Sequence, residues 1–525
     1  MIMEMHCHTC EYSACSLVKA VTLVQRVLEK GLQGIAITDH HHFWPAEKLV
    51  ELRAAVDVPG TFLILSGQEV GTPEFGDVLV YGADRVYPSG TCIDVIRREF
   101  PEAALVLAHA YRNGRLPDEA TLLDPRLDGI EIFNSNHTVS ENTRGLKDWH
   151  RYKFTAIAGS DTHAENYAGL YPTVFDHPIW TVEEMAAEIR AGNCHPYFRE
   201  IHRASSSDTQ IVELTLGRKE KQAPDRKIIV KTHQDTKTWA QAERAYYIMR
   251  ELGTCCFTGG KYRIPLPVDE DPQTLTIIEQ RVKGKVLKEF LATAEKSDAR
   301  QAIQLTAGWV ARLHNARVQV TPPEEFLELE PARLDECLDF LRRAKHRHID
   351  RIVEIRDAVM DTERALYGEK TEVLVQGHGD LHPGNVLIGQ DDPADPESHF
   401  AAVIDFTSSR AMPPAFDVGA FIEQFQYQFF QKPEITAKVS ADDFLTAYLA
   451  EAEDLPDDFL SQVQLFKVRT TLRIMAYLIG LGMGQHPDMW RLMVEAERNL
   501  AHLDSIGFLV RNHGGIAAAA ESGQR

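Results

Sequence analysis

The chain has 525 residues, of which 44% are hydrophobic and 25% are charged, and its formal net charge is −21 at pH 7. The length suggests two to four folding units of ordinary globular composition, and the acidic balance disfavours nucleic acids and anionic membranes as partners. No apolar run approaches the ~18 residues that cross a bilayer, the start lacks a secretory pattern, and eight cysteines do not suggest a disulfide framework. We therefore expect a cytoplasmic protein without a membrane partner.

Residues 1–195 alternate between strand-like apolar runs and helical patterns such as 17–30 and 182–191. The strand-like runs are 2–8, 34–38, 61–70, 77–82, 104–110, 129–134 and 154–161. This alternation favours an α/β fold with a mostly parallel sheet, either open or closed into a barrel. In such sheets, active sites collect at the carboxyl ends of the strands.

Almost every one of these runs ends in an imidazole or a carboxylate. The side chains at the strand ends are His6, His8, Asp39, His40, Glu69, His109, His137, Asp161 and His163. A single histidine at a strand end is usually a packing residue, but so many in the same position indicate a metal site. Mixed imidazole and carboxylate ligands suit Zn, Mn or Fe, and bridging carboxylates let two or three ions share one site. Such a site can activate water for phosphoryl displacement.

A thiolate site is the alternative for the first segment, MHCHTCEYSACS, which contains Cys7, Cys10 and Cys15. No second cysteine pair follows at zinc-finger spacing. Alternate residues of a strand point to opposite faces, so Cys7 faces away from His6 and His8. The pattern therefore assigns the metal to the histidines.

The ordered motifs HxH, TDHH, GQE, AHA, GIEIFNSNH and AGSDTH resemble those of the PHP (polymerase and histidinol phosphatase) superfamily, over about residues 3–192. The resemblance implies a distorted (β/α)₇ barrel that holds two or three divalent metals and hydrolyses phosphate esters. It also implies that Asp39 orients an imidazole. The ligands that it implies are His6, His8, His40, Glu69, His109, His137, Asp161 and His163. Small members carry an aspartate after HxH, so here either Glu11 substitutes as a ligand or one metal position is weak or empty.

The pattern changes near residues 195–199. Three strand-like runs, 198–205, 209–216 and 226–233, follow one another across short polar turns and predict an antiparallel meander. After them the chain is mostly helical to about residue 503, and 391–398 reads as a surface hairpin loop. We expect domains at 1–195 and 199–505, with a tail at 506–525.

The most specific motif of the second half is VLVQGHGDLHPGNVLI (373–388), followed by AAVIDF (401–406). Its spacing resembles the catalytic loop of protein kinases, with Gly379 in place of arginine. Phosphoryl transfer from ATP needs a carboxylate base and oxygen ligands for Mg²⁺. Asp380 fits the base, and Asn385 and Asp405 fit the Mg²⁺ ligands.

The residues upstream of this motif fit the same reading. Lys231 lies in the third strand of the meander, where kinases keep their phosphate-binding lysine, and Glu243 in the following helix can pair with it. A solvated helix charge is the alternative for Glu243. Residues 275–284 resemble the hinge strand that meets adenine.

This half resembles the aminoglycoside phosphotransferase family, also called choline-kinase-like, over about residues 199–505. The resemblance implies a bilobal protein-kinase-like fold that uses ATP and Mg to phosphorylate hydroxyls of small molecules. It also implies that Lys231 binds the α- and β-phosphates of ATP. The first turn, SSSDT, lacks a glycine-rich loop, so the hydroxyls and backbone amides of Ser205, Ser206 and Ser207 are the candidate phosphate contacts.

Three functional hypotheses follow. The first is a bifunctional enzyme that joins a metal-dependent phosphoesterase to an ATP-dependent small-molecule kinase, with phosphorylated and hydroxylated small molecules as substrates. The second is a PHP phosphatase that is regulated by a nucleotide-binding, kinase-like module. The third is a scaffold built from two relic folds, which the intact residue sets disfavour.

Overall fold

The computed structural model describes residues 1–203, 208–218, 227–343, 345–368, 370–484 and 486–509. Contacts within the chain divide it into two compact units. The first unit comprises Met1–Asp235 and Val268–Arg281, and the second comprises Thr236–Pro267 and Val282–Arg525. Among the described residues, no helix is both long enough and apolar enough to span a bilayer.

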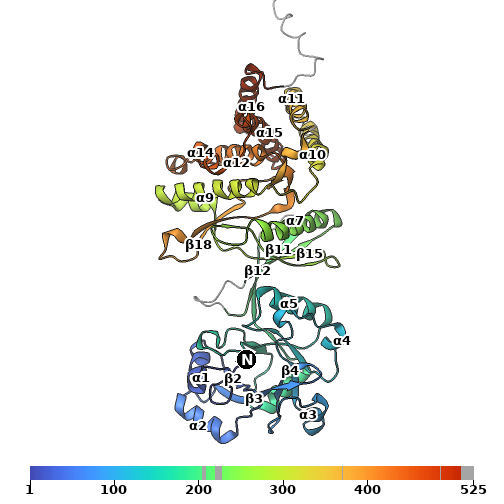
Figure 1. The fold of residues 1–525 in the computed structure, drawn as a ribbon, viewed down its shortest axis with the longest axis vertical. Helices are drawn as coiled ribbons and strands as arrows, with labels where there is room; N and C mark the ends of the chain where they lie inside the picture. The colour runs from blue at the N-terminus through green and yellow to red at the C-terminus, as the bar shows by residue number, and fades with distance from the viewer. Residues whose placement is uncertain (204–207, 219–226, 344, 369, 485, 510–525) are drawn as a thin grey trace, which may run out of the picture. The chain divides into compact units, whose positions relative to one another are not determined.

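The first unit begins with a mixed α/β domain, drawn in blue to green in Figure 1. Its strands are β1 (Ile2–Glu4), β2 (Gly34–Ile37), β3 (Leu63–Thr72), β4 (Gly76–Tyr81), β5 (Ala104–Leu107), β6 (Gly129–Phe133), β7 (Ala156–Ala158), β8 (Thr173–Phe175) and β9 (Cys194–Pro196). Its helices are α1 (Ala20–Glu29), α2 (Ala46–Val56), α3 (Ile93–Glu99), α4 (Glu119–Leu122), α5 (Val139–Tyr152) and α6 (Val182–Ala191). The seven strands expected from the apolar runs are confirmed.

These strands form one sheet in the order β7-β6-β5-β4-β3-β2-β1-β8-β9. The pairs β1/β2, β2/β3, β5/β6 and β6/β7 are parallel, whereas β3, β4 and β5 pair antiparallel. The edge strands β7 and β9 contact each other, so the sheet is nearly closed like a barrel. Strands β8 and β9 are short and were not expected from the sequence.

A second sheet belongs to the same unit. It has the strand order β10-β11-β12-β15-β14. The strands are β10 (Phe198–His202), β11 (Thr209–Leu216), β12 (Lys227–His233), β14 (Pro267–Asp271) and β15 (Thr276–Gln280). The antiparallel meander expected over β10, β11 and β12 is confirmed.

The two sheets of the first unit share a hydrophobic core. Leu214, Leu216, Ile228 and Ile278 of the five-stranded sheet are buried in the same cluster as barrel residues such as Leu170. The backbones approach closely here: a Cβ at Gly217 would lie 2.6 Å from the Leu170 carbonyl oxygen, and the φ of Gly217 is +72°. Glycine is the residue that tolerates both conditions.

The second unit is mostly helical. Its helices are α7 (Thr236–Cys255), α8 (Leu287–Thr293), α9 (Lys296–Asn315), α10 (Glu324–Arg343), α11 (Ile349–Tyr367), α12 (Pro414–Phe429), α13 (Pro433–Thr436), α14 (Ala441–Glu451), α15 (Phe459–Gly480) and α16 (Pro487–Ser505). Its strands are β13 (Tyr262–Arg263), β16 (Lys285–Val286), β17 (Val375–Gly377), β18 (Val386–Gln390), β19 (His399–Val403) and β20 (Arg410–Met412). Strands β18 and β19 pair antiparallel on either side of 391–398, which confirms the expected hairpin loop.

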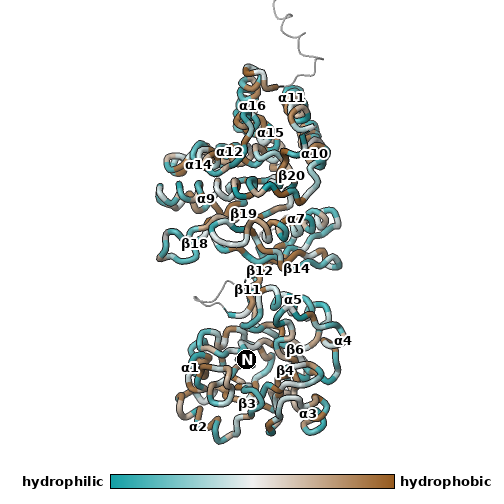
Figure 2. Tube along the Cα trace, in the orientation of Figure 1, coloured by the Kyte–Doolittle hydropathy of each residue, from teal (hydrophilic) through white to brown (hydrophobic). Residues whose placement is uncertain are grey.

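Two hydrophobic clusters hold the second unit together. One places α9 and α12 beside β18 and β19 around the fully buried Trp309, and the other joins α10, α11, α15 and α16. In Figure 2, hydrophobic and hydrophilic residues alternate along these helices, as expected for helices with one buried face.

Candidate active sites

The first site gathers the side chains that follow the strands of the nearly closed sheet. Two isolated parallel bridges link these segments. Cys7, which follows β1, pairs with Thr162, which follows β7, and His40, which follows β2, pairs with Glu69 within β3. They bring segments that lie far apart in the chain to one end of the barrel. The clustering expected from the strand-end pattern follows from this geometry.

Glu69 lies at the centre of the cluster. Its Oε2 atom is 3.3 Å from His6 Nε2, 3.1 Å from His8 Nε2 and 3.2 Å from His40 Nδ1, while its Oε1 atom is 2.9 Å from His109 Nε2. The Glu69 side chain is only 1% exposed. One buried carboxylate therefore faces four imidazoles, which is the arrangement that a metal-bridging ligand requires.

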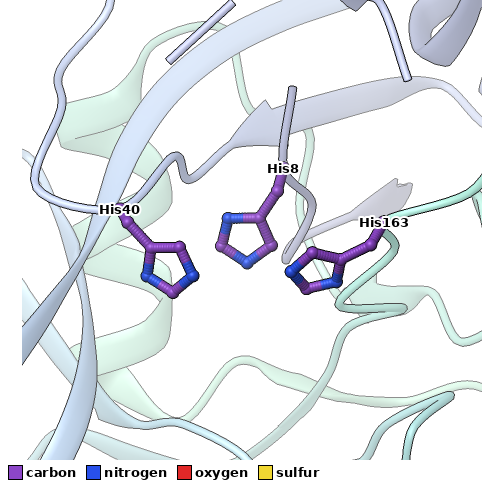
Figure 3. A group of neighbouring side chains, drawn as sticks. All are labelled: His8, His40 and His163. Atoms are coloured by element: carbon purple, nitrogen blue, oxygen red, sulfur yellow. The ribbon is translucent and has the colours of Figure 1, made fainter. Parts of the chain in front are cut away.

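Asp161 forms a second carboxylate contact with the HxH pair. Its Oδ1 atom lies 3.5 Å from His6 Nε2 and 3.2 Å from His8 Nε2. The His8 ring also lies between those of His40 and His163, with ring centroids 4.4 and 4.6 Å away (Figure 3). His8 thus belongs to two possible ligand groups, one with His6 and Asp161 and one with His40 and His163.

Asp77 completes a third ligand group that the sequence reasoning missed. Its Oδ2 atom lies 3.6 Å from His109 Nε2, and Glu69, Asp77 and His109 can offer ligand atoms within 4.8 Å of one another. Asp77 is the second residue of β4 and reaches the site because β3 and β4 pair antiparallel, with Gly71 opposite Asp77. The aspartate of the segment PEFGD (73–77), which follows the GQE strand, was the available signal.

Glu131 fixes the orientation of the first ligand. Its Oε1 atom lies 2.9 Å from His6 Nδ1, and its Oε2 atom accepts a hydrogen bond of 2.7 Å from the His109 backbone N–H. With Nδ1 bound to a carboxylate, the His6 Nε2 atom faces Glu69 and Asp161. Burial alone would lower the pKa of His6, but Glu131 and Glu69 raise it to about 10, so a proton and a metal cation compete for this nitrogen.

Asp39 holds the loop that carries the ligands. It accepts hydrogen bonds from Thr9 N, Ser13 Oγ and Trp44 Nε1 at 2.7, 2.6 and 2.8 Å, and Ser13 Oγ lies 3.4 Å from His8 Nδ1. Asp39 therefore contacts His8 through Ser13. This placement agrees with the orienting role that the family resemblance implies.

Two residues of this site have a strained backbone conformation. His109 and Asp161 adopt φ values of 30° and 46°, a region that residues other than glycine rarely occupy. Such strain is commonly found at functional positions. Arg112 forms an ion pair with Asp161 Oδ2, and its side chain is 28% exposed. Arg112 was not anticipated from the sequence.

Two of the expected ligands lie outside the three ligand groups. The Glu11 carboxylate accepts a hydrogen bond of 3.1 Å from Ala20 N at the first turn of α1. His137 lies with Nδ1 at 3.0 Å from Asn142 Oδ1, and its buried Nε2 has no hydrogen-bond partner within the described part of the chain. The role of either residue as a ligand stays a prediction.

The donor set fits divalent metals. Apart from the unpartnered His137 Nε2, a second buried imidazole nitrogen, His109 Nδ1, has no hydrogen-bond partner among the described residues. Burial and the neighbouring His8 and His6 lower the pKa of His163 to about 4, so its imidazole is neutral at pH 7 and able to bind a cation. Nitrogen and carboxylate donors in this mixture suit Mn, Fe or Zn.

The second site lies in the second unit, in the loop between β17 and β18. Asn385 Nδ2 donates a hydrogen bond of 3.0 Å to the Asp380 carbonyl oxygen, and Ile404 N donates one of 2.9 Å to the Asn385 carbonyl oxygen. The second bond ties the loop to the residue before Asp405. Asp405 itself adopts a strained φ of 69° and is exposed. The structure therefore brings Asp380, Asn385 and Asp405 into one neighbourhood.

Asp417, in the first turn of α12, binds the backbone of this loop. Its fully buried carboxylate accepts hydrogen bonds from His378 N at 2.6 Å and Gly379 N at 2.8 Å, and lies 3.3 Å from His314 Nε2. Burial alone would raise the pKa of Asp417, but the hydrogen bond and charge of His314 hold it below its ordinary value. Asp417 thus holds two backbone N–H groups of the loop, and His314 contacts its carboxylate from α9. Neither residue was expected from the sequence.

The upstream candidates are divided between the two units. In the first unit, Lys231 Nζ on β12 lies 2.7 Å from Glu279 Oε1 on β15. In the second unit, Glu243 lies half-buried on α7, a helix that contacts the Phe406–Ser408 turn directly after Asp405. Ser205, Ser206 and Ser207 lie outside the described residues. Pairing of Lys231 with Glu243 stays a prediction.

Comparison with protein families finds a match in each half of the chain. Residues 4–164 match the model of the PHP domain, 139–194 match a PHP-associated model, and 218–457 match the phosphotransferase enzyme family. No curated protein matches the chain. The family match assigns residues 4–164 of the first unit to a PHP domain. The chain therefore contains a PHP domain followed by a domain of the phosphotransferase enzyme family, and the expected barrel-like and kinase-like folds are confirmed.

Several solved kinases share a distant likeness with the chain. A choline kinase from Cryptosporidium parvum Iowa II has 14% identity, a TM-score of 0.41, and coverage of 59% of this chain and 91% of its own. A Plasmodium vivax ethanolamine kinase has 14% identity, a TM-score of 0.39, and coverage of 59% and 83%. The amicoumacin kinase hAmiN has 16% identity, a TM-score of 0.39, and coverage of 58% and 88%. These scores are low, so the assignment of the second half rests on the family model.

Proposed function

We propose that the chain is a bifunctional enzyme, a metal-dependent phosphoesterase joined to an ATP-dependent kinase of small-molecule hydroxyls. The observation that supports it best is that, within each of the two sites, the expected residues lie close together. Glu69 and Asp161 each face both histidines of the HxH pair within 3.5 Å, and Asp417 holds the loop of Asp380 and Asn385 by two backbone hydrogen bonds.

In the phosphoesterase, His6, His8, His40, Glu69, Asp77, His109, Asp161 and His163 would hold two or three divalent ions. Bound ions would supply Lewis acidity and an activated water. Glu131 keeps the His6 Nε2 lone pair facing the cluster, and Asp39 braces the loop through Ser13. Arg112, partly exposed beside Asp161, offers N–H donors to phosphate oxygens.

In the kinase, Asp380 accepts the proton of the acceptor hydroxyl. The hydroxyl oxygen bonds to the γ-phosphorus of ATP, and the bond between that phosphorus and the ADP oxygen breaks. Asn385 and Asp405 would hold Mg²⁺, which neutralises charge on the phosphates. Because Asn385 uses Nδ2 to hold the Asp380 carbonyl oxygen, its side-chain oxygen is left for the cation. Lys231 would bind the α/β-phosphates, and Glu279 keeps its ammonium in place.

The test uses one variant for each site in the full-length protein. We expect His8→Ala to lose metal and hydrolysis of p-nitrophenyl phosphate or bis(p-nitrophenyl) phosphate while keeping alcohol-dependent ADP release. Asp380→Asn should show the reverse pattern. Bifunctionality is wrong if neither variant removes a distinct activity.

A regulated phosphoesterase is the second candidate, and one observation favours it. The sheet that carries Lys231 shares its core with the barrel, and Lys147 on α5 reaches Asp269 Oδ2 at 3.1 Å and the Glu270 carbonyl oxygen at 2.8 Å. Nucleotide bound to this sheet would act on the barrel through packed side chains. A phosphatase rate that changes with ATP, without any alcohol phosphorylation, would support this function over the first.

A further inference from the structure

A cavity of about 380 Å³ lies in the second unit between α10, α15 and the turn after Asp405. Leu334, Phe340 and Ala476 form apolar walls, and Ser408 and Arg473 contribute polar groups. This volume lies within the range of small-molecule sites, which combine apolar walls with a few polar groups that orient the ligand. Neither the family models nor the sequence motifs assign these residues a role.

The cavity reaches the expected catalytic base through Arg473. The Nη2 atom of Arg473 lies 3.4 Å from Asp380 Oδ1, and its Nη1 atom donates a hydrogen bond of 3.1 Å to the Gly379 carbonyl oxygen. The side chains of Arg473 and Asp380 are 32% and 36% exposed, so both are accessible to a ligand. A molecule in this cavity would therefore present its hydroxyl beside Asp380.

Two arginines line the cavity, and of these Arg473 is the one that contacts Asp380. Arg469, one turn earlier on α15, is 2% exposed and forms an ion pair with Glu363 Oε1 at 3.2 Å, so its charge is balanced inside the protein. Glu336 lines the opposite wall, where it is exposed to solvent. The two contacts of Arg473 use two of the five N–H donors of a guanidinium, which leaves donors for a ligand.

We propose that this cavity binds the phosphoryl acceptor and that Arg473 recognises a carboxylate or phosphate group on it. The inference rests on the proposed kinase function and names its substrate class, an alcohol that carries a negative charge. A guanidinium prefers a bidentate anion to a single carboxylate oxygen at 3.4 Å. An anionic acceptor would draw Arg473 away from Asp380 and leave that carboxylate to accept the hydroxyl proton. A cationic acceptor would meet repulsion at the same point.

The test compares three matched alcohols, glycerol, glycerate and glycerol 3-phosphate, with choline as the cationic probe. ADP release with ATP and Mg²⁺ and calorimetric binding are measured on the full-length wild type, Arg473→Met and Arg473→Lys. In the wild type we expect glycerate or glycerol 3-phosphate to be preferred over glycerol by about 10- to 100-fold in kcat/KM or affinity. Arg473→Met should abolish that preference through KM, and Arg473→Lys should restore part of it. Preference for glycerate identifies a carboxylate, and preference for glycerol 3-phosphate identifies a phosphate.

The control is Arg351→Met, which removes an exposed arginine that pairs with Glu497 at 2.8 Å outside the cavity lining and should keep the anion preference. The inference is overturned if glycerol or choline is preferred, if no anionic probe binds or reacts, or if Arg473→Met lowers kcat equally for all acceptors. The last result would mean that Arg473 only positions Asp380. Failure of the proposed kinase function has a different signature, since ADP release would then be independent of any alcohol and unchanged in Asp380→Asn.

Discussion

His6 Nδ1 lies 2.9 Å from Glu131 Oε1, and both side chains are fully buried. This pair determines which nitrogen of His6 faces Glu69 and Asp161. Glu131 lies on a strand 125 positions after His6 in the chain. A carboxylate behind a metal-binding histidine also makes the imidazole a stronger ligand. The pair is therefore a sensitive point at which to test the metal site.

Replacing Glu131 by Gln keeps the shape of the side chain but removes its charge. We expect a 10- to 100-fold loss of metal affinity, about the effect that such supporting partners have in other metal sites. Metal titration followed by mass spectrometry of the bound ions measures it. The matched control is Glu188→Gln, because Glu188 meets the exposed His177 at 2.8 Å away from the site. Equal metal affinities in both variants would contradict a supporting role for Glu131.

Glu11 is a ligand candidate from the sequence alone, whereas Asp77 is a ligand candidate from the structure alone. Glu11 accepts the backbone N–H of Ala20, so Glu11→Ala should keep its metal and lose about 1 kcal/mol of stability, as for loss of a helix cap. Asp77→Ala should lower metal stoichiometry or affinity, because Asp77 shares a ligand group with Glu69 and His109. Metal content and thermal unfolding of both variants decide the matter. Metal loss in Glu11→Ala alone would reverse the assignment.

Asp417→Asn tests the support of the kinase loop. Asparagine keeps the side-chain size but loses the charge that strengthens the hydrogen bonds from His378 N and Gly379 N. Each charge-assisted bond contributes about 1.5–3 kcal/mol, so we expect kcat of ADP release to fall by at least roughly tenfold. The KM for ATP should change little. A change in KM without a change in kcat would show that Asp417 does not position Asp380.

Glu423 on α12 predicts a pH-dependent stability. Burial, together with the charge of Glu495, raises the pKa of Glu423 from 4.5 to about 7 against the opposing effects of Lys467, Thr471 and Arg491. A raised pKa in the folded state gives a stability contribution that is present below pH 4.5 and lost as pH rises through 7. The loss amounts to roughly 3 kcal/mol at pH 8.

Glu423→Gln removes this titration. We expect the Tm of the variant to exceed that of the wild type at pH 8, with the gap shrinking as pH falls towards 5. Calorimetry between these pH values measures the gap, and Glu497→Gln, which alters a partly exposed carboxylate paired with Arg351, serves as the control. A gap that does not depend on pH would show that Glu423 does not titrate in this range.

Local pattern determined much about this protein. The strand-end histidines and carboxylates, the HGDLHPGN loop and the meander after residue 198 follow from strand periodicity and motif spacing, which act over a few residues. Periodicity puts His6 and His8 on one face of a strand, and the spacing of Asp380 and Asn385 sets them in one loop. The family models agree with both domains that these motifs indicated.

Tertiary structure decided which distant side chains complete the sites. Asp77 joins His109 through the register of a hairpin, Glu131 reaches His6 from another strand, and Arg473 meets Asp380 across 93 positions. Glu11, near HxH in sequence, accepts a hydrogen bond from the backbone at the first turn of α1. Such contacts depend on packing between elements, and a charged residue on a strand or helix has no local signature of its partner. The local pattern therefore indicates the kind of chemistry at each site, and tertiary packing determines which distant side chains contact the residues of that site.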